Sequence, residues 1–251
     1  MVAGYSAAQV RAAEAPHLAA GEPLMLRAAA ALAAVIRAEL VAAGRPRGPV
    51  LLLVGAGDNG GDALFAGAAL AADGVEVLAA PTGPRRHAEG DAAGRVAGVV
   101  FLEPDETEPE EVGAIAAGSA VVVDGILGTG TSASPALRGP ARELVAAVLA
   151  SIAGHAGRAG HAGRSERSDR GPGGASARPI VVAVDLPSGI QPDDGTVPDP
   201  IVLRADVTVT FGAVKAGMLL EPAAEYAGRL ELVDLGLGPE LATMVPLVER
   251  A

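Results

Sequence analysis

Five aliphatic runs constrain the fold of this chain more than any other feature. They begin at the following residues: Pro49 (PVLLLV), Val75 (VEVLAA), Gly98 (GVVFL), Ala120 (AVVVD) and Pro179 (PIVVAVD). Strands that show little alternation between apolar and polar residues are buried on both faces, as in parallel sheets covered by helices. Helical patterns separate these runs, near the following ranges: 62–72, 87–96, 109–117 and 140–152.

The segments at the two ends of the chain extend this pattern. Ser6 with Gln9 predicts a capped helix, and a second helix is expected over 24–43. After Asp185 two further strands are expected, beginning at Ala205 and Gly228, with no long helix between them. The sequence therefore predicts one domain over residues 1–251, an α/β protein built as a three-layer α/β/α sandwich with a mostly parallel sheet.

Composition excludes several classes of function. The chain of 251 residues has a net charge of −11, which argues against nucleic acid as a partner. It has no cysteine, so disulfides and thiolate metal sites are excluded. No signal peptide and no apolar stretch long enough to cross a membrane is visible. We expect a cytoplasmic protein that does not associate with membranes.

Residues 154–178 do not fit a core. This segment is rich in Gly, Ser and Arg, with five arginines against Glu166 and Asp169. Its composition cannot bury enough apolar surface to offset the entropy of ordering. We expect a flexible, dispensable surface insertion between a helix and a strand.

A glycine-dense stretch, VGAGDNGGDALFAG (54–67), follows the first aliphatic run and leads into a helix. A strand, a glycine loop and a helix start form an arrangement that binds anions. Gly55, Gly57 and Gly60 fit the G-x-G-x-x-G spacing of dinucleotide-binding folds. However, Asp58 and Asp62 would repel a pyrophosphate, which favours a loop that holds a ribose, a cation or a reacting group.

Two other strands end in similar polar loops. One is DGILGTG, which starts at Asp124, and the other is DLPSG, which starts at Asp185. A single aspartate at a strand end often caps its own turn. Three such loops at the carboxyl ends of neighbouring parallel strands instead favour a ligand site, where a carboxylate can bind a hydroxyl, hold a cation or move a proton.

Lys215 is the only lysine in a chain that otherwise uses arginine for positive charge. A compact ammonium group can approach a ligand or titrate in ways that a guanidinium cannot. Because Lys215 follows a predicted strand, we expect it to act at the same cleft. Chance in a lysine-poor composition is the alternative.

Together these motifs resemble the N-terminal domain family of YjeF proteins, the NAD(P)H-hydrate epimerases. GAGDNGGDALFAGAAL resembles the family's NNGGDG loop, VVVDGILGTG its D-A-L-F-G-T-G segment, and VVAVDLPSGIQPDDGTV its D-x-P-S-G segment. ADVTVTFGAVKAG resembles its T-x-T-F-x-x-x-K-x-G block, and the first two helices match as well. The resemblance spans nearly the whole chain and omits the 154–178 insertion.

The resemblance implies a Rossmann-like fold and an isomerase of nicotinamide cofactor repair. Such an enzyme interconverts the R and S epimers of hydrated NADH or NADPH, so that a partner dehydratase can restore the S form. Asp185 would bind substrate and transfer protons, with Lys215 as a second catalytic group. A potassium ion would be held by Asn59, Asp124 and Ser188. The substrate-binding residues implied are the following: Asp58, Asn59, Gly60, Gly61, Asp62, Gly128, Thr129, Gly130, Thr131, Ser132, Ala133, Ser134 and Asp185.

Some positions depart from the family pattern. Asp58 replaces an asparagine, Ala63 a glycine, and Leu26 a common glutamate. Two other functions stay open: a cation-dependent nucleotide-binding module without catalysis, and an NAD-dependent dehydrogenase. The dehydrogenase is disfavoured because VEVLAAPTG has no acidic residue at the end of the second strand to bind a ribose. A homodimer is a further possibility.

Overall fold

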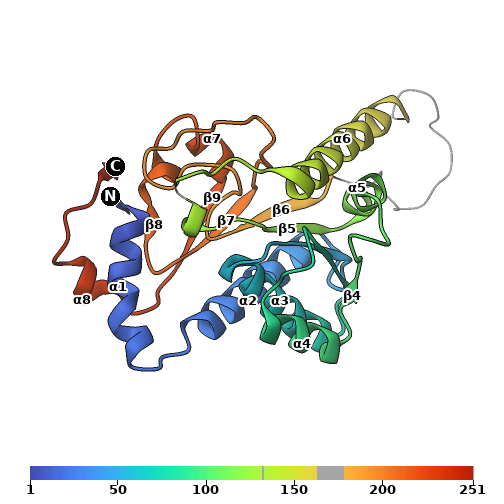
Figure 1. The fold of residues 1–251 in the computed structure, drawn as a ribbon. Helices are drawn as coiled ribbons and strands as arrows, with labels where there is room; N and C mark the ends of the chain where they lie inside the picture. Colours follow the sequence, from blue (N-terminus) through green and yellow to red (C-terminus); the bar gives the residue numbers. More distant parts are fainter. Residues whose placement is uncertain (132, 163–177, 251) are drawn as a thin grey trace.

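A seven-stranded sheet in which every neighbouring pair is parallel forms the middle layer of the domain (Figure 1). The computed structural model describes residues 1–131, 133–162 and 178–250. The strand order is β4-β3-β2-β5-β6-β7-β9. The strands span the following residues: β2 Val50–Val54, β3 Val77–Pro81, β4 Val100–Phe101, β5 Val121–Gly125, β6 Ile180–Val184, β7 Val207–Phe211 and β9 Arg229–Val233.

Helices cover both faces of this sheet, which confirms the predicted three-layer architecture. They span the following residues: α1 Ala7–Ala19, α2 Leu24–Ala42, α3 Asp58–Ala72, α4 Ala88–Ala97, α5 Pro109–Gly118, α6 Gly139–Ala162, α7 Ala224–Ala227 and α8 Gly238–Leu241. Figure 1 shows α2, α3 and α4 on one side of the sheet and α5 and α6 on the other. Ser6 caps α1 with Gln9 in the predicted reciprocal arrangement.

Strand β2 shows why its sequence lacks alternation. Val50, Leu52 and Val54 belong to the core beneath α2 and α3, whereas Leu51 and Leu53 belong to the core beneath α5 and α6. All five side chains are at most 1% exposed. Because successive side chains of a strand point to opposite faces, two apolar cores require an unbroken aliphatic run.

A second, three-stranded sheet lies beside the main one. Its order is β10-β1-β8, formed by Val248–Arg250, Val2–Tyr5 and Val214–Lys215. The pairing of Tyr5 with Lys215 ties the start of the chain to the segment after β7. Two 3₁₀ helices, η1 (Thr129–Thr131) and η2 (Ala216–Leu219), complete the structure described.

Two predicted boundaries were wrong. Helix α3 begins at Asp58 and not near Asp62, because Gly57 provides an extended N-terminal residue and the first turn tolerates Gly60 and Gly61. Helix α6 continues to Ala162 and includes the first part of the predicted insertion. Residues 154–162 contain no proline, and their alanines favour a helix despite the glycines. The rest of that predicted segment, 163–177, lies outside the described residues.

Within the described ranges, none of the helices combines the length and the apolar character needed to cross a membrane.

Candidate active site at the switch point of the sheet

Strands β2 and β5 lie side by side at the centre of the sheet, and the connections from them run in opposite directions. From β2 the chain moves outward to β3 and β4, and from β5 it moves outward to β6, β7 and β9. Such a reversal opens a crevice at the carboxyl ends of the two central strands, where ligands bind in open α/β folds. The three polar loops predicted to converge follow β2, β5 and β6, so they do meet at this edge.

Glycines allow the first two loops to pack against each other. A Cβ atom on Gly55 would lie 1.8 Å from the carbonyl oxygen of Ile126, and one on Gly128 would lie 2.3 Å from Asn59 Oδ1. Any larger residue would therefore push the β2 and β5 loops apart. This contact fixes the start of α3 beside the Gly128–Gly130 segment.

A saturated polar cluster, formed by Asp124, Ser188 and Asn59, holds all three loops together. The Ser188 hydroxyl donates to Asp124 Oδ1 over 2.6 Å, and the Ser188 amide donates to Oδ2 over 2.8 Å. The Asn59 side-chain amide donates to the carbonyl oxygens of Leu127 (3.1 Å) and Val184 (2.5 Å). Burial raises the pKa of Asp124, although its hydrogen bonds from Ser188 act in the opposite direction.

Asp185 stands at the end of β6 with a backbone φ of 68°, a left-handed conformation that aspartate tolerates better than most residues. Its Oδ1 accepts hydrogen bonds from the Phe211 amide (3.2 Å) and the Thr210 hydroxyl (3.3 Å), and it forms an ion pair with Lys215. Because these donors converge on Oδ1, the carboxylate has a fixed orientation at the edge of the cavity.

Lys215 is only 1% exposed and lies beneath Asp185. Its ammonium group also donates to the Thr210 hydroxyl (3.1 Å) and the Phe211 carbonyl oxygen (3.0 Å). The structure thus places Lys215 against Asp185 but in the core, whereas we expected it at the cleft itself. The lysine contacts Asp185 and these β7 groups from below, and the described structure does not place it among the residues that face the cavity.

Asp62, on the first turns of α3, lies in surroundings that differ from those of Asp185. It is 6% exposed, and its buried Oδ1 has no hydrogen-bond partner within the described part of the chain. Burial, followed by the nearby charges of Asp185 and Asp58, raises the pKa of Asp62 from 3.8 to about 8. A carboxyl group in this position holds its proton near neutral pH.

These groups surround a cavity of about 420 Å³, which we call the switch cavity. The residues that line it are the following: Glu14, Ala56, Gly57, Asp58, Asn59, Asp62, Ile126, Leu127, Gly128, Thr129, Gly130, Asp185 and Phe211. Glu14, from α1, was not predicted from the sequence, because no motif marks a single glutamate on a helix. Burial raises the pKa of this carboxyl group as well.

The remaining predicted substrate-binding residues are placed differently. Gly60 and Gly61 are buried where α3 packs on the Gly55 backbone and on His87. Thr131 ends η1, Ala133 is exposed, and the Ser134 hydroxyl accepts a hydrogen bond from Arg138. Ser132 lies outside the described residues.

Proteins of known name match this chain over nearly its whole length. An NAD(P)H-hydrate epimerase of Clavibacter sepedonicus is 52% identical over 98% of this chain and 96% of its own length. An enzyme of the same name from Microbacterium testaceum is 45% identical over 100% of this chain and 85% of its own. The bifunctional NAD(P)H-hydrate repair enzyme Nnr of Mycobacterium tuberculosis is 36% identical over 93% of this chain, which matches 41% of that protein.

The fold also has a solved counterpart. The crystal structure of the yeast protein ynu0 superimposes with a TM-score of 0.66, covering 87% of this chain and 83% of that one, at 18% identity. The family model described as "YjeF-related protein N-terminus" matches residues 21–217, which include the switch cavity apart from Glu14. This chain therefore belongs to the YjeF-related N-terminal family.

Proposed function

We propose that this protein is an NAD(P)H-hydrate epimerase whose chemistry takes place in the switch cavity. The relatives that match nearly the full chain carry this name. The observation that carries the proposal is a pair of carboxyl groups in different surroundings. Asp185 is paired with Lys215, whereas Asp62 Oδ1 has no hydrogen-bond partner among the described residues and burial raises the pKa of Asp62 to about 8. Two carboxyl groups that lie in different surroundings can take the separate roles of acid and base.

The substrate requires such a pair. Hydration of a reduced nicotinamide ring places the hydroxyl on the carbon bonded to the ring nitrogen, because an enamine accepts a proton on its β carbon and water at the adjacent carbon. To invert that carbon, the C–O bond breaks as a proton joins the oxygen, and the nitrogen lone pair forms an iminium ion. Water then adds to the other face and loses a proton, so water and proton balance.

The two carboxyl groups fit these two proton transfers. Asp62, protonated near neutral pH, donates a proton to the departing hydroxyl. The carboxylate of Asp185, oriented by Lys215 and Phe211, takes a proton from the water that returns. Lys215 is a positioning residue in this scheme, since it contacts Asp185 and lies outside the lining of the cavity.

The charge of the cavity suits the intermediate. Glu14 and Asp58 line it along with Asp62 and Asp185, so several carboxyl groups surround the space where the iminium ion forms. Fixed charges that oppose a developing charge stabilise the transition state. The acidity that disfavoured a pyrophosphate at Asp58 and Asp62 thus favours a cationic ring there. The pyrophosphate would lie along the Gly128–Gly130 segment, away from Asp58 and Asp62.

The residues of the saturated polar cluster fit a potassium ion. Asp124 is 1% exposed and accepts hydrogen bonds, and none of the ion pairs among the described residues involves its carboxylate. The carbonyl oxygens of Leu127 and Val184 and the hydroxyl of Ser188 meet at the same place, and oxygen donors of this kind suit hard cations. A potassium ion held by Asn59, Asp124 and Ser188 would supply positive charge beside the acidic cavity.

The test of the potassium site uses two measurements. The melting temperature and the epimerisation rate are compared in potassium chloride and in tetramethylammonium chloride at equal ionic strength. We expect both to be higher in potassium, and we expect Ser188→Ala to reduce the difference. Equal melting temperatures in the two salts would argue against the site.

The central experiment follows the epimers directly. Purified R epimer of hydrated NADH is incubated with the protein, and the S form is separated by chromatography. We expect the two forms to equilibrate much faster than without protein. If the protein binds the hydrate without exchange of epimers, it is a non-catalytic binding module.

A functional partner follows from the same chemistry. An enzyme that only equilibrates two epimers restores no cofactor by itself, so we infer that it works with a dehydratase that consumes the S form. The bifunctional repair enzymes, of which this chain matches about two fifths, support such a link. In a coupled assay, the epimerase should allow a dehydratase specific for the S form to consume the whole mixture of R and S epimers.

A further inference from the structure

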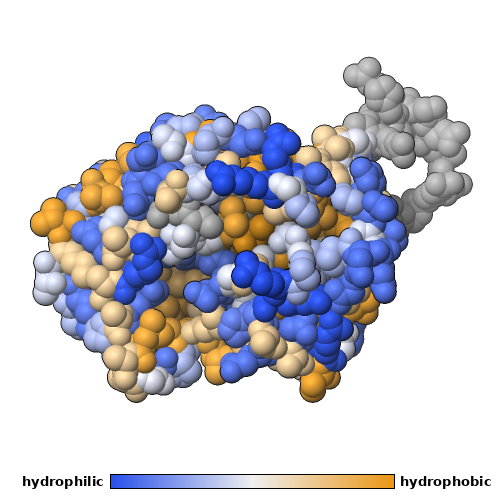
Figure 2. Space-filling model, in the orientation of Figure 1, coloured by the Kyte–Doolittle hydropathy of each residue, from blue (hydrophilic) through white to orange (hydrophobic). Residues whose placement is uncertain are grey.

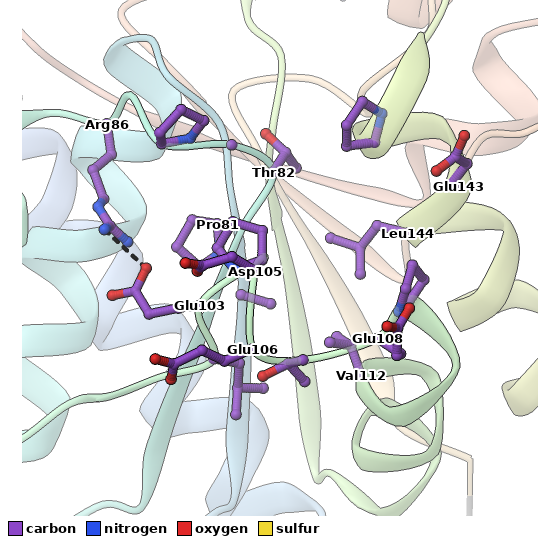
Figure 3. Close-up of a pocket in the computed structure, with 18 residues that line it drawn as sticks. Pro81, Thr82, Arg86, Glu103, Asp105, Glu106, Glu108, Val112, Glu143 and Leu144 are labelled. Carbon is purple, nitrogen blue, oxygen red and sulfur yellow. Dashed lines mark hydrogen bonds and ion pairs between the residues drawn. The ribbon is translucent and has the colours of Figure 1, made fainter.

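A second cavity, of about 760 Å³, opens at the same edge of the sheet, one strand away from the switch cavity (Figure 3). Its walls come from the ends of β3 and β4 and from the first turns of α5 and α6. We call it the side cavity. The Thr82 amide donates to the carbonyl oxygen of Val54 over 2.9 Å, directly before the loop that lines the switch cavity. The two cavities therefore open at the carboxyl ends of neighbouring strands, β3 and β2.

The floor of the side cavity is apolar. Ala80, Val112 and Leu144 are each less than 9% exposed, and prolines flank them. Figure 3 shows Leu144 and Val112 pointing into the space opposite Pro81 and Thr82. Figure 2, in the orientation of Figure 1, shows hydrophobic side chains near the middle of the visible surface of the molecule, with hydrophilic ones around them. A flat, uncharged ring system suits such a floor.

The rim is acidic. Five carboxyl groups line the cavity, contributed by the following residues: Glu103, Asp105, Glu106, Glu108 and Glu143. The positive side chain of the lining is Arg86, which pairs with Glu103 over 2.9 Å and with Asp91 over 2.9 Å and keeps one buried nitrogen, Nη1, without a hydrogen-bond partner among the described residues. Because the carboxyl groups of the rim outnumber this one cation, the site favours a ligand that donates hydrogen bonds over an anion.

Building on the function proposed above, we propose that the side cavity binds the adenosine of hydrated NADH and discriminates against the 2′-phosphate of hydrated NADPH. In doubly wound folds a dinucleotide lies across the switch point, and an acidic residue accepts the ribose 2′-hydroxyl hydrogen bond. Here the carboxylates come from the loop after β4 and from α6. This arrangement supplies the acidic group that the end of β3 lacks in the sequence.

The first experiment measures binding by titration calorimetry with ADP-ribose and with 2′-phospho-ADP-ribose, neither of which can react. We expect ADP-ribose to bind at least about tenfold more tightly, because a phosphate dianion faces several carboxylates. The triple variant Asp105→Asn/Glu106→Gln/Glu143→Gln should reduce that ratio to less than about threefold. The control Glu76→Gln/Glu221→Gln/Glu249→Gln removes the same charge from exposed positions outside the cavity and should keep the ratio.

A second variant tests where the adenosine lies. Thr107, half-buried in the wall, is replaced by tryptophan to fill the space. We expect the KM for hydrated NADH to rise about tenfold more than the KM for hydrated reduced nicotinamide mononucleotide, which lacks adenosine. Circular dichroism and the melting temperature verify that the variant folds.

The outcomes separate this inference from the proposed function. Equal wild-type affinities for the two ADP-ribose probes would overturn the discrimination, and an unchanged ADP-ribose affinity in Thr107→Trp would overturn the location. If both binding results hold but no epimers exchange, the side cavity is confirmed as an adenosine site and the epimerase function fails.

Discussion

The saturated polar cluster and the switch cavity lie side by side and share loops, yet their polar groups differ in how completely they are hydrogen-bonded. In the cluster, both oxygens of Asp124 accept hydrogen bonds, and Asn59 and Ser188 connect all three loops. In the cavity, Asp62 has a buried oxygen that accepts no hydrogen bond from the described part of the chain, and the described donors to Asp185 converge on its Oδ1. Where polar groups satisfy one another they hold loops, and where they do not they are available to a substrate.

This difference predicts different consequences for mutations. Changes in the cavity should lower the rate, because these groups act on the substrate. Asp185→Asn should also reduce stability, because it leaves the buried Lys215 without its partner. Changes in the cluster, or in the lysine beneath Asp185, should alter stability first. The predictions below test this separation, from the largest expected effect to the smallest.

Asp185→Asn should have the largest effect on rate. Asparagine keeps the size of the side chain and tolerates the left-handed backbone, but it cannot accept the proton from water. We expect kcat for epimerisation to fall by about 10²- to 10⁴-fold. Asp58→Asn, in the same cavity but exposed, should lose much less. Similar rates for Asp185→Asn and the wild type would remove Asp185 from the mechanism.

Lys215→Met should mainly affect stability. It leaves the carboxylate of Asp185 without its cation in a buried position, which costs about 3–5 kcal/mol when one partner of a buried pair is removed. Urea denaturation measures the loss. The double variant Lys215→Met/Asp185→Asn should recover much of it, because no unpaired charge remains. A double variant as unstable as the single one would show that the lysine acts through packing.

Ser188→Ala tests the cluster. It removes the hydroxyl that bonds Asp124 and accepts from the Leu127 amide, leaving both without that partner. We expect a loss of about 1–3 kcal/mol in the free energy of unfolding. Thr243→Ala, which removes a hydroxyl bonded at an exposed helix end, serves as the control and should cost less. Equal losses in both variants would mean that the hydrogen bonds of the cluster contribute no more to the free energy of unfolding than an exposed hydrogen bond does.

Asp62 predicts a pH dependence of stability. Its folded pKa of about 8 lies above the ordinary value of 3.8, so the folded protein retains a proton that the unfolded chain loses. The stabilisation from this proton is complete below about pH 4 and is lost as the pH rises towards 8, at up to about 1.4 kcal/mol per pH unit. Asp62→Asn should remove this contribution to the slope in urea denaturation between pH 5 and 8, and Glu76→Gln, at an exposed position outside the cavity, should keep it. A slope shared by all three proteins would contradict the raised pKa.

The sequence was sufficient to predict the central sheet. Strands β2, β5 and β6 are buried on both faces, so their aliphatic runs are unmistakable, and the loops after them had to meet at one edge. The small sheet was not predictable, because β1 and β8 are too short to show a pattern. The start of α3 was missed because glycines usually mark a loop, whereas here close packing on Gly55 requires them.

The site was predicted only in part, for a physical reason. Motifs identify residues that stand close together in sequence, such as Asp58 to Asp62. Glu14 reaches the switch cavity from a separate helix, and the side cavity takes its carboxylates from the loop after β4 and from α6. Neither assembly leaves a local signal. Lys215 was found through its rarity, but its burial beneath Asp185 is a property of the folded chain alone.

The direction of helix α6 has a consequence for how this protein can be modified. The helix begins beside the side cavity and carries the chain to the opposite end of the sheet, where β6 starts. There Arg178 forms an ion pair with Asp206, which also accepts a hydrogen bond from the Val181 amide, so the first residues of β6 are fastened independently of what precedes them. A fluorophore or a fused domain introduced between α6 and Arg178 would thus join the molecule at the end remote from both cavities.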